Sequence, residues 1–224
     1  SGSQNILVQN CVIRKVHTGA KVYGKNSGII YSEIYEISER PVQIGLECNT
    51  HKYDEPDHNF VQNCYIYSTG MVGISNTPIY VQGVQNVVSH NLIQGTYAVS
   101  IYLFAAAECI IEYNEIVGGP DGTYDYGSIY AAPSGGQTGN HIRYNYIHDT
   151  ARFSKQSNPH SIYLDEGARG NFVYGNVMTN VQNGVYLHFG SDNVVVDNVV
   201  MSFREGRHEA GIFGNEKMAD KTIA

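Results

Sequence analysis

The chain of 224 residues contains no tryptophan, few prolines (6) and only 4 cysteines. It also has no run of about 18 apolar residues, so we expect neither a transmembrane helix nor a membrane partner. Cys11, Cys48, Cys64 and Cys109 lack the C-x-x-C spacing of zinc sites and are interpreted as small buried or turn residues. The cysteines therefore predict no metal site.

Charged residues are also scarce, at 16% of the chain, and the formal net charge is -7. An acidic surface repels nucleic acid and anionic membranes, so nucleic acid is not expected as a partner. An anionic polysaccharide is a less natural substrate for the same reason, unless a cation screens its charge. The abundant residues are glycine (24) and tyrosine (18), which favour many short strands joined by turns.

A repeated motif, an asparagine or serine followed by apolar residues, recurs at intervals of about 22 to 31 residues. Its copies begin at Asn10, Ser32, Asn63, Asn91, Asn114, Asn145, Asn176 and Asn198. The short apolar segments on either side lack the 3.6-residue period of a helix. The pattern predicts an all-β fold, a right-handed parallel β-helix of about eight coils stacked about 4.8 Å apart.

The repeated asparagines are interpreted as turn residues, because their side chains can bond backbone groups and they tolerate a left-handed backbone. Cys11 and Cys64 hold the same repeat position two coils apart, at roughly twice the coil spacing. A disulfide needs Cα atoms within about 7 Å, so we predict that these two cysteines are not bridged.

The opening Ser1–Ser3 is interpreted as an expression scar, and residues 4–224 as a single β-helix domain. Solenoids need polar caps at their ends, and none is evident here. Either further coils or domains of the same protein supply the caps, or a partner covers the ends. The longer intervals place loops at Lys52–His58, Gly118–Tyr126 and Ala151–Pro159, and loops over a rigid solenoid often carry function.

The last strand of each coil can be aligned on an apolar residue expected to point inward. The aligned residues are Val22, Ile44, Ile74, Ile101, Ile129, Ile162, Val185 and Ile212. Because strand residues alternate between faces, the following residue points outward, and it is aromatic in the last five coils. These aromatics are Tyr102, Tyr130, Tyr163, Tyr186 and Phe213. Two residues further on, the outward column contains Asp165 and His188, and Asp125 enters the neighbouring strand.

Aromatic rings bind the C–H faces of sugars, and paired carboxylates perform acid–base work at a glycosidic bond. The pattern therefore predicts Asp125 and Asp165 as catalytic residues. The expected substrate-binding residues are Tyr130, Tyr163, Tyr186, His188 and Glu166, with Arg143 and His148 as weaker candidates. If this hypothesis is right, Asp125 and Asp165 lie on one outward face within about 10 Å of each other.

Each of these features also has a purely structural interpretation. The tyrosine column can be packing between coils, and Asp125 can cap a turn. Asp165-Glu166-Gly167 can be an acidic turn, and His188 a surface residue. Their occurrence together, next to long loops, favours a functional site. No cofactor is expected, except that Asp54, Glu55 and Asp57 form a weak candidate calcium site, for which a solvated loop is the simpler interpretation.

Three segments carry a resemblance to a known family: Asp125–Tyr130, Asn140–Asp149 and Ser161–Gly167. Together they resemble bacterial right-handed parallel β-helix carbohydrate-active enzymes, and most of all glycoside hydrolase family 141, over roughly residues 86–203. The resemblance implies a secreted or periplasmic hydrolase of plant or complex glycans, such as a fucosidase or xylanase, with its catalytic carboxylates at Asp125 and Asp165. Glu166 stands where the family often has a second aspartate.

Two alternative functions remain open for a chain of this fold. One is a polysaccharide lyase, which needs a basic residue; the candidates are Arg143, Arg152, Lys155 and Arg169. The other is a non-catalytic β-helix that binds a glycan or serves a structural role. The net acidic charge weighs against the lyase.

Overall fold

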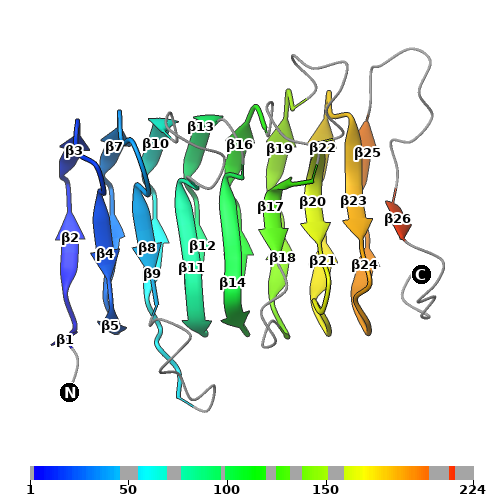
Figure 1. Cartoon of the computed structure of the whole chain (residues 1–224), viewed down its shortest axis with the longest axis horizontal. Coiled ribbons are helices and arrows are strands. Elements are labelled where there is room, and N and C mark those ends of the chain that lie inside the picture. The colour runs from blue at the N-terminus through cyan, green and yellow to red at the C-terminus, as the bar shows by residue number, and fades with distance from the viewer. Residues whose placement is uncertain are drawn as a thin grey trace.

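The computed structural model describes residues 3–45, 55–69, 77–96, 99–119, 125–131, 138–150 and 159–201, and the backbone of 212–214. The described residues form strands and turns without an α-helix. Three parallel eight-stranded sheets run the length of the molecule, and β1 (Ser3–Gln4) pairs separately with β5 (Gly24–Lys25). Every coil contributes one strand to each large sheet, so the strands lie side by side from the first coil to the last (Figure 1).

The three sheets are named here in the order in which a coil visits them. The first sheet comprises β2 (Leu7–Gln9), β6 (Gly28–Ile30), β9 (Phe60–Gln62), β12 (Val87–Ser89), β15 (Ile110–Glu112), β18 (His141–Arg143), β21 (Phe172–Tyr174) and β24 (Val194–Val196). The second comprises β3 (Val12–Arg14), β7 (Glu33–Tyr35), β10 (Tyr65–Thr69), β13 (Leu92–Thr96), β16 (Glu115–Val117), β19 (Tyr146–His148), β22 (Val177–Thr179) and β25 (Val199–Met201). The third comprises β4 (Ala20–Val22), β8 (Val42–Ile44), β11 (Ile79–Val84), β14 (Ile101–Ala107), β17 (Gly127–Ala131), β20 (His160–Leu164), β23 (Asn183–Leu187) and β26 (Ile212–Gly214). This arrangement confirms the predicted parallel β-helix of eight coils.

The core is a set of aliphatic columns that run along the solenoid axis. Most strands of the first two sheets have three residues, and their central residue is the one that points inward. In β18 and β19 these central residues are Ile142 and Ile147, which are fully buried. Burying one such side chain contributes roughly 1.5–3 kcal/mol, and the column repeats the gain in every coil.

A ladder of buried side chains crosses the turn between the first and second sheets. Asn145 accepts a hydrogen bond from the backbone N–H of Asn114 at 3.1 Å, and Asn176 accepts one from the N–H of Asn145 at 3.0 Å. The side-chain amide of each asparagine donates to a carbonyl, as Asn145 does to Ile111 at 2.9 Å. The predicted structural role of the repeated asparagines is confirmed.

Two details of the predicted ladder are wrong. Each coil contributes one residue, here called a rung, to the ladder. The rung before Asn91 is Cys64 rather than Asn63, and the rung before Ser32 is Cys11 rather than Asn10. The left-handed backbone falls on the residue before each rung, as at Asn63 and Tyr144, with φ of 53° and 55°. The rung asparagines themselves do not have a positive φ, because their role is side-chain hydrogen bonding. As predicted, Cys11 and Cys64 are free thiols, as is Cys109, whereas Cys48 lies outside the described residues.

A second ladder, which the sequence analysis missed, crosses the turn between the third and first sheets. Asn171 accepts from the N–H of Asn140 at 3.2 Å, and Asn193 accepts from the N–H of Asn171 at 3.1 Å. Its members precede those of the first ladder by five residues. The pairs are Asn86 with Asn91, Asn140 with Asn145, Asn171 with Asn176, and Asn193 with Asn198. An Asn-x-x-x-x-Asn search would have found them.

The third sheet also differs from its predicted alignment. Ile79 pairs with Val42 and Ile101, so β11, rather than the segment around Ile74, supplies the third-sheet strand of that coil. The predicted alignment is also shifted by two residues at Val22 and Ile44, because Ala20 and Val42 hold the position of Ile101. Ile74 itself lies outside the described residues, as do Asp54, Arg152, Lys155 and most of the three predicted loops. The correction extends the outward aromatic column by one coil, because Tyr80 pairs with Tyr102.

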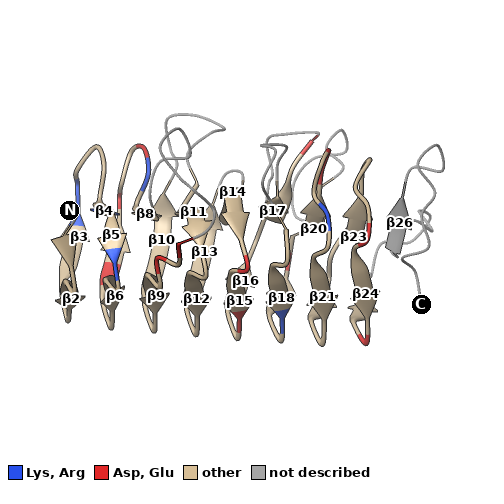
Figure 2. Ribbon diagram, turned by 90° about the horizontal axis from the view of Figure 1, so that it is seen from below, with Lys and Arg blue, Asp and Glu red and all other residues tan. Residues whose placement is uncertain are grey.

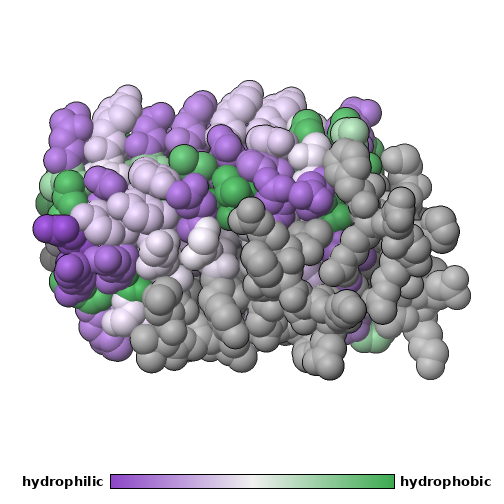
Figure 3. Space-filling model, turned by 90° about the horizontal axis from the view of Figure 1, so that it is seen from above, coloured by the Kyte–Doolittle hydropathy of each residue, from purple (hydrophilic) through white to green (hydrophobic). Residues whose placement is uncertain are grey.

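The described residues drawn in Figures 2 and 3 mix charged, hydrophilic and hydrophobic side chains. Acidic and basic residues are distributed over several coils (Figure 2), and hydrophobic residues form small patches among hydrophilic ones on the face shown in Figure 3. None of the described residues belongs to a helix long and apolar enough to cross a bilayer.

Candidate active site

The three sheets separate the predicted site residues onto different faces. Asp165 directly follows β20 and His188 directly follows β23, both on the third sheet. Arg143 belongs to β18 of the first sheet, and His148 to β19 of the second. Including Arg143 and His148 in the site was therefore wrong: both belong to the same coil as Asp165, but the chain turns between sheets before it reaches β20.

Arg143 and His148 are engaged where they lie. Arg143 pairs with Glu112 at 2.6 Å and donates to the hydroxyl of Tyr174 at 2.7 Å. His148 contacts Glu115 at 3.2 Å and Asp149 at 2.8 Å. Apart from Asp149, which directly follows His148, these partners lie in neighbouring coils, and their contacts are of the kind that hold neighbouring strands together.

The outward aromatic column of the third sheet forms an apolar cluster separate from the main core. Tyr130 and Tyr163 pair in register, and their ring centroids lie 5.2 Å apart; those of Tyr163 and Tyr186 lie 4.8 Å apart. Tyr163 is only 1% exposed and Tyr130 only 6%. The expectation that these two rings offer open faces to sugars is wrong, because each packs against its neighbours in the column. Tyr186 is half-buried and keeps more of its surface.

Asp165 is the carboxylate around which this cluster is organised. Its Oδ2 accepts a hydrogen bond from the hydroxyl of Tyr130 at 2.5 Å. Its Oδ1 accepts from the hydroxyl of Tyr163 at 3.2 Å and from the backbone N–H of Glu166 at 2.8 Å. With 7% of its surface exposed, Asp165 has exchanged water almost entirely for protein donors.

The protonation state of the cluster follows from these contacts. Burial raises the pKa of Asp165, but hydrogen bonds from Tyr130, His188, the Glu166 N–H and Tyr163 outweigh it, and the pKa lies below the usual 3.8. Burial and the neighbouring carboxylates raise the pKa of Tyr163 far above its usual range, and burial with the hydrogen bond to Asp165 does the same for Tyr130. The site at neutral pH is thus an ionised carboxylate held by protonated phenols.

Tyr163 joins the two predicted catalytic residues. Its hydroxyl lies 3.1 Å from Oδ1 of Asp125 and 3.2 Å from Oδ1 of Asp165. The separation of the two carboxylate oxygens cannot exceed the sum of these distances, which is below the limit of about 10 Å for paired glycosidase acids. The predicted proximity on one outward face is confirmed. Asp125, two residues before β17, is exposed, whereas Asp165 is buried.

His188 is held by Asp165 from the neighbouring coil. Its Nδ1 lies 2.7 Å from Oδ1 of Asp165 and 3.3 Å from the hydroxyl of Tyr163. In the tautomer with a proton on Nδ1, the imidazole donates to the carboxylate and leaves Nε2 able to accept a proton. The predicted adjacency of Asp165 and His188 in one column is confirmed. Glu166 contributes its backbone N–H to Asp165, and its own side chain is exposed.

His160, at the start of β20, belongs to this cluster and was missed. Its ring stacks on Tyr186 at 4.6 Å and meets the edge of Tyr163 at 5.1 Å. Burial lowers the pKa of His160 to about 4, so the imidazole is neutral near pH 7. In the sequence it precedes Ile162 by two residues, and simple alternation would place it inside; no pattern pointed to its contact with the outward tyrosines.

The candidate calcium residues have other partners. Glu55 pairs with Lys25 at 2.6 Å. Asp57 is fully buried, and its carboxylate accepts from the N–H of Val84 at 3.2 Å, so the predicted solvated loop is wrong at Asp57. Among the described residues no group of three or more histidine, cysteine or acidic side chains is placed to hold a metal ion.

Comparisons with known proteins agree with this architecture. Residues 77–216 match the family model described as "Right handed beta helix region". No curated protein sequence matches the chain. An alginate lyase from Paenibacillus sp. str. FPU-7 superposes with a TM-score of 0.58 at 17% identity, over 96% of this chain and 76% of that one.

The Streptococcus pneumoniae surface protein and adhesin PfbA superposes with a TM-score of 0.56 at 14% identity, over 94% of this chain and 67% of that one. At these identities the two similarities concern the fold alone. One similar structure is an enzyme and the other an adhesin, so the fold is compatible with more than one function.

Proposed function

This chain belongs to the family of proteins with a right-handed beta helix region, and we propose that it is a glycoside hydrolase acting at Asp125 and Asp165. The observation that carries the proposal is the hydroxyl of Tyr163, which lies within hydrogen-bonding distance of both carboxylates, at 3.1 Å from Asp125 and 3.2 Å from Asp165. One carboxylate is exposed and the other is buried and held ionised, and such unequal pairs divide acid and base work between them.

The environments favour a particular division of roles. Asp125 is exposed and can reach a bound glycan; once it has taken a proton from solvent, it gives that proton to the glycosidic oxygen as the C–O bond breaks. The negative charge of Asp165 stabilises the positive charge that develops on the sugar. Both oxygens of Asp165 already accept hydrogen bonds, so it acts on water through His188 rather than by direct attack.

In this scheme water attacks the anomeric carbon while Nε2 of His188 accepts its proton. The resulting imidazolium is stabilised by Asp165 at 2.7 Å. It then releases its proton to solvent, and solvent returns a proton to Asp125, which restores both groups. Direct attack by water predicts inversion of the anomeric configuration. The two carboxylates lie closer together than the roughly 6.5–9.5 Å of inverting pairs, so the competing outcome is retention, which would require Asp165 itself to attack the sugar. The anomer released first, observed by NMR during hydrolysis, tests that prediction.

The main test is a panel of plant and host glycans assayed for released sugar. Wild type is compared with Asp125→Asn and Asp165→Asn, and Glu115→Gln on the exposed second sheet is the matched control. We expect the two aspartate variants to lose at least about 100-fold in turnover and the control to keep its activity. The hydrolase is rejected if wild type releases no sugar from any glycan or if Asp165→Asn is fully active.

A polysaccharide lyase is the second candidate, favoured by the orientation of His188. An imidazole fixed by a carboxylate beside a phenol could abstract a proton and return one. The surroundings weigh against an anionic substrate, because within the described residues no lysine or arginine pairs with Asp125, Asp165 or His188. An unsaturated product that absorbs ultraviolet light, formed without hydrolysis, would show that the protein is a lyase and not a hydrolase.

Binding without turnover would instead support a glycan-binding β-helix. In that case Asp125→Asn and Asp165→Asn bind glycan as wild type does, and neither they nor wild type release product. We further propose that the substrate is a polysaccharide or oligosaccharide and that the protein acts outside the cytoplasm, in the medium or the periplasm, where polymeric glycans are encountered.

A further inference from the structure

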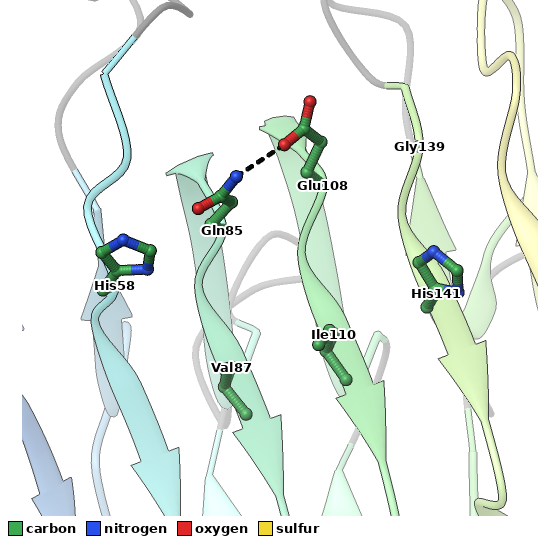
Figure 4. A pocket seen from close by; sticks show the side chains of 7 residues that line it. All are labelled: His58, Gln85, Val87, Glu108, Ile110, Gly139 and His141. Atoms are coloured by element: carbon green, nitrogen blue, oxygen red, sulfur yellow. Dashed lines mark hydrogen bonds between the residues drawn. The ribbon is translucent and has the colours of Figure 1, made fainter.

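A groove lies on the outer face of the first sheet, away from the site on the third sheet. It has a volume of about 490 Å³, within the range of ligand sites, and it crosses four coils. Its lining consists of His58, Gln85, Val87, Glu108, Ile110, Gly139 and His141 (Figure 4). None of these residues takes part in the Asp125–Asp165 site.

The groove exists because a side chain is missing from a repeated position. His58, Gln85 and Glu108 occupy the same left-handed turn position in consecutive coils, with φ of 52°, 57° and 54°. The next coil has Gly139 there, with φ of 68°, and the space that a side chain would fill stays open. A methyl group added at Gly139 would come within 3.4 Å of Cγ of Glu108 and enter the groove.

The groove wall at His141 is fixed by its neighbours. The imidazole stacks on Phe172 with the ring centroids 4.8 Å apart and an angle of 14° between the planes. Its Nδ1 lies 3.5 Å from the hydroxyl of Tyr174, which in turn accepts a hydrogen bond from Arg143 at 2.7 Å. A wall held in this way loses little conformational entropy when a ligand binds.

The floor and the rim differ in polarity. Val87 and Ile110 begin neighbouring strands and give an aliphatic floor, as Figure 4 shows. Above them Nε2 of Gln85 donates to Oε2 of Glu108 at 2.7 Å, which leaves the amide oxygen and the second carboxylate oxygen for other partners. An apolar floor beneath such a rim matches a sugar ring, with its C–H face and its hydroxyl edge.

The charges around the groove argue against an anionic ligand. Glu108 is the charged side chain of the lining. Arg143, the nearby cation, is paired with Glu112 at 2.6 Å. Burial, together with the charge of Arg143, lowers the pKa of His141, so its imidazole is neutral at pH 7. A phosphate, sulfate or uronate would face a carboxylate here without a free cation in the lining.

From this lining we infer that the groove is a second binding site, which takes a neutral sugar unit of a glycan chain. It is independent of the hydrolase proposal, because the groove and the Asp165 cluster lie on different sheets and share no residue. A chain held here would be anchored by binding alone, and the groove residues would take no part in bond cleavage.

Histidine-selective NMR provides the test, with neutral xylohexaose and cellohexaose as probes. The imidazole signals of His58 and His141 are assigned from single-site variants and followed during titration, beside those of His188 at the other site. We expect the signals of His58 and His141 to shift in a saturable way with at least one probe. Gly139→Asn, which fills the hollow, should abolish these shifts.

Gly170→Asn is the matched control. Gly170 follows Gly139 in the same column one coil later, with φ of 62°, and does not line the groove. Asn at position 170 requires the same left-handed backbone, and its Cβ would meet Oγ1 of Thr138 at 3.1 Å, a tighter contact than that at Gly139. Binding retained in Gly170→Asn and lost in Gly139→Asn therefore supports the site. Unchanged signals of His58 and His141 with both probes would overturn it, as would shifts that persist in Gly139→Asn. Shifts confined to His188 would locate binding at the other site and also overturn it.

Discussion

The outer faces of the second and third sheets obey the same alternation and have opposite environments. On the second sheet the outward residues are open to solvent: Tyr146 is 41% exposed and Val199 48%. On the third sheet Tyr163 points outward as well, yet it is 1% exposed. Strand alternation therefore decides direction but not exposure, and the third sheet uses its outward face to hold a buried carboxylate.

The largest expected difference between the two faces is in stability. Tyr163 and Tyr146 lie on the same coil, so Tyr163→Ala and Tyr146→Ala form a matched pair. We expect Tyr163→Ala to lose about 3–5 kcal/mol of unfolding free energy, as buried aromatics do. Tyr146→Ala should lose less than about 1 kcal/mol, because its ring is solvated. Urea unfolding measures both, and equal losses would erase the distinction between the faces.

A smaller effect is expected from removing a single hydroxyl on the third sheet. Tyr130→Phe deletes the 2.5 Å hydrogen bond to Asp165, and a bond to a charged group is worth about 1.5–3 kcal/mol. Tyr102, in the preceding coil, contacts Tyr130 through its ring, so Tyr102→Phe should cost less than about 0.5 kcal/mol. Urea unfolding again gives the comparison. Equal costs would mean that the short hydrogen bond does not hold the carboxylate.

The smallest effect should appear as a pH dependence. Because the folded pKa of Asp165 lies below its ordinary value, ionisation of Asp165 stabilises the fold above pH 3.8, and the gain is lost as pH falls through the folded pKa. The difference in unfolding free energy between wild type and Asp165→Asn should therefore narrow as the pH falls below 3.8.

Unfolding measured across this range, with Tyr146→Phe as a control that does not titrate in acid, tests the pH dependence. The difference in unfolding free energy between wild type and Tyr146→Phe should not change with pH. If the difference in unfolding free energy between wild type and Asp165→Asn instead widens below pH 3.8, the pKa of Asp165 is shifted in the opposite direction.

Much of the candidate site could be predicted because the repeat converts sequence intervals into spatial neighbours. Asp165 and His188 were expected in one column, and they hydrogen-bond at 2.7 Å. Asp125 was expected beside Asp165, and Tyr163 bridges the two. Parallel strands keep their register over the whole solenoid, so residues that are neighbours in adjacent coils are one repeat apart in the sequence. Aligning the repeats therefore identifies such neighbours.

The errors came where a side chain's role depends on what surrounds it. Arg143 and His148 were grouped with Asp165 because they are close in the sequence, but turns place them on other sheets. The predicted position of the first asparagine ladder was wrong by one residue in two coils. In both coils a cysteine holds the ladder position, and the alignment used the asparagine next to it instead. In these cases the predictions relied on residues that are close in the sequence. The structure instead follows the register between coils.

The amino-acid sequence alone determined the β-helix, its coil count and, for most strand residues, the side of the sheet to which the side chain points. These follow from repeat length and alternation, which are local properties. Only the tertiary structure decided that the outward tyrosines are buried, that Asp165 stays ionised and that Gly139 opens a groove. Burial and desolvation depend on residues from several coils at once, so no single segment carries that information.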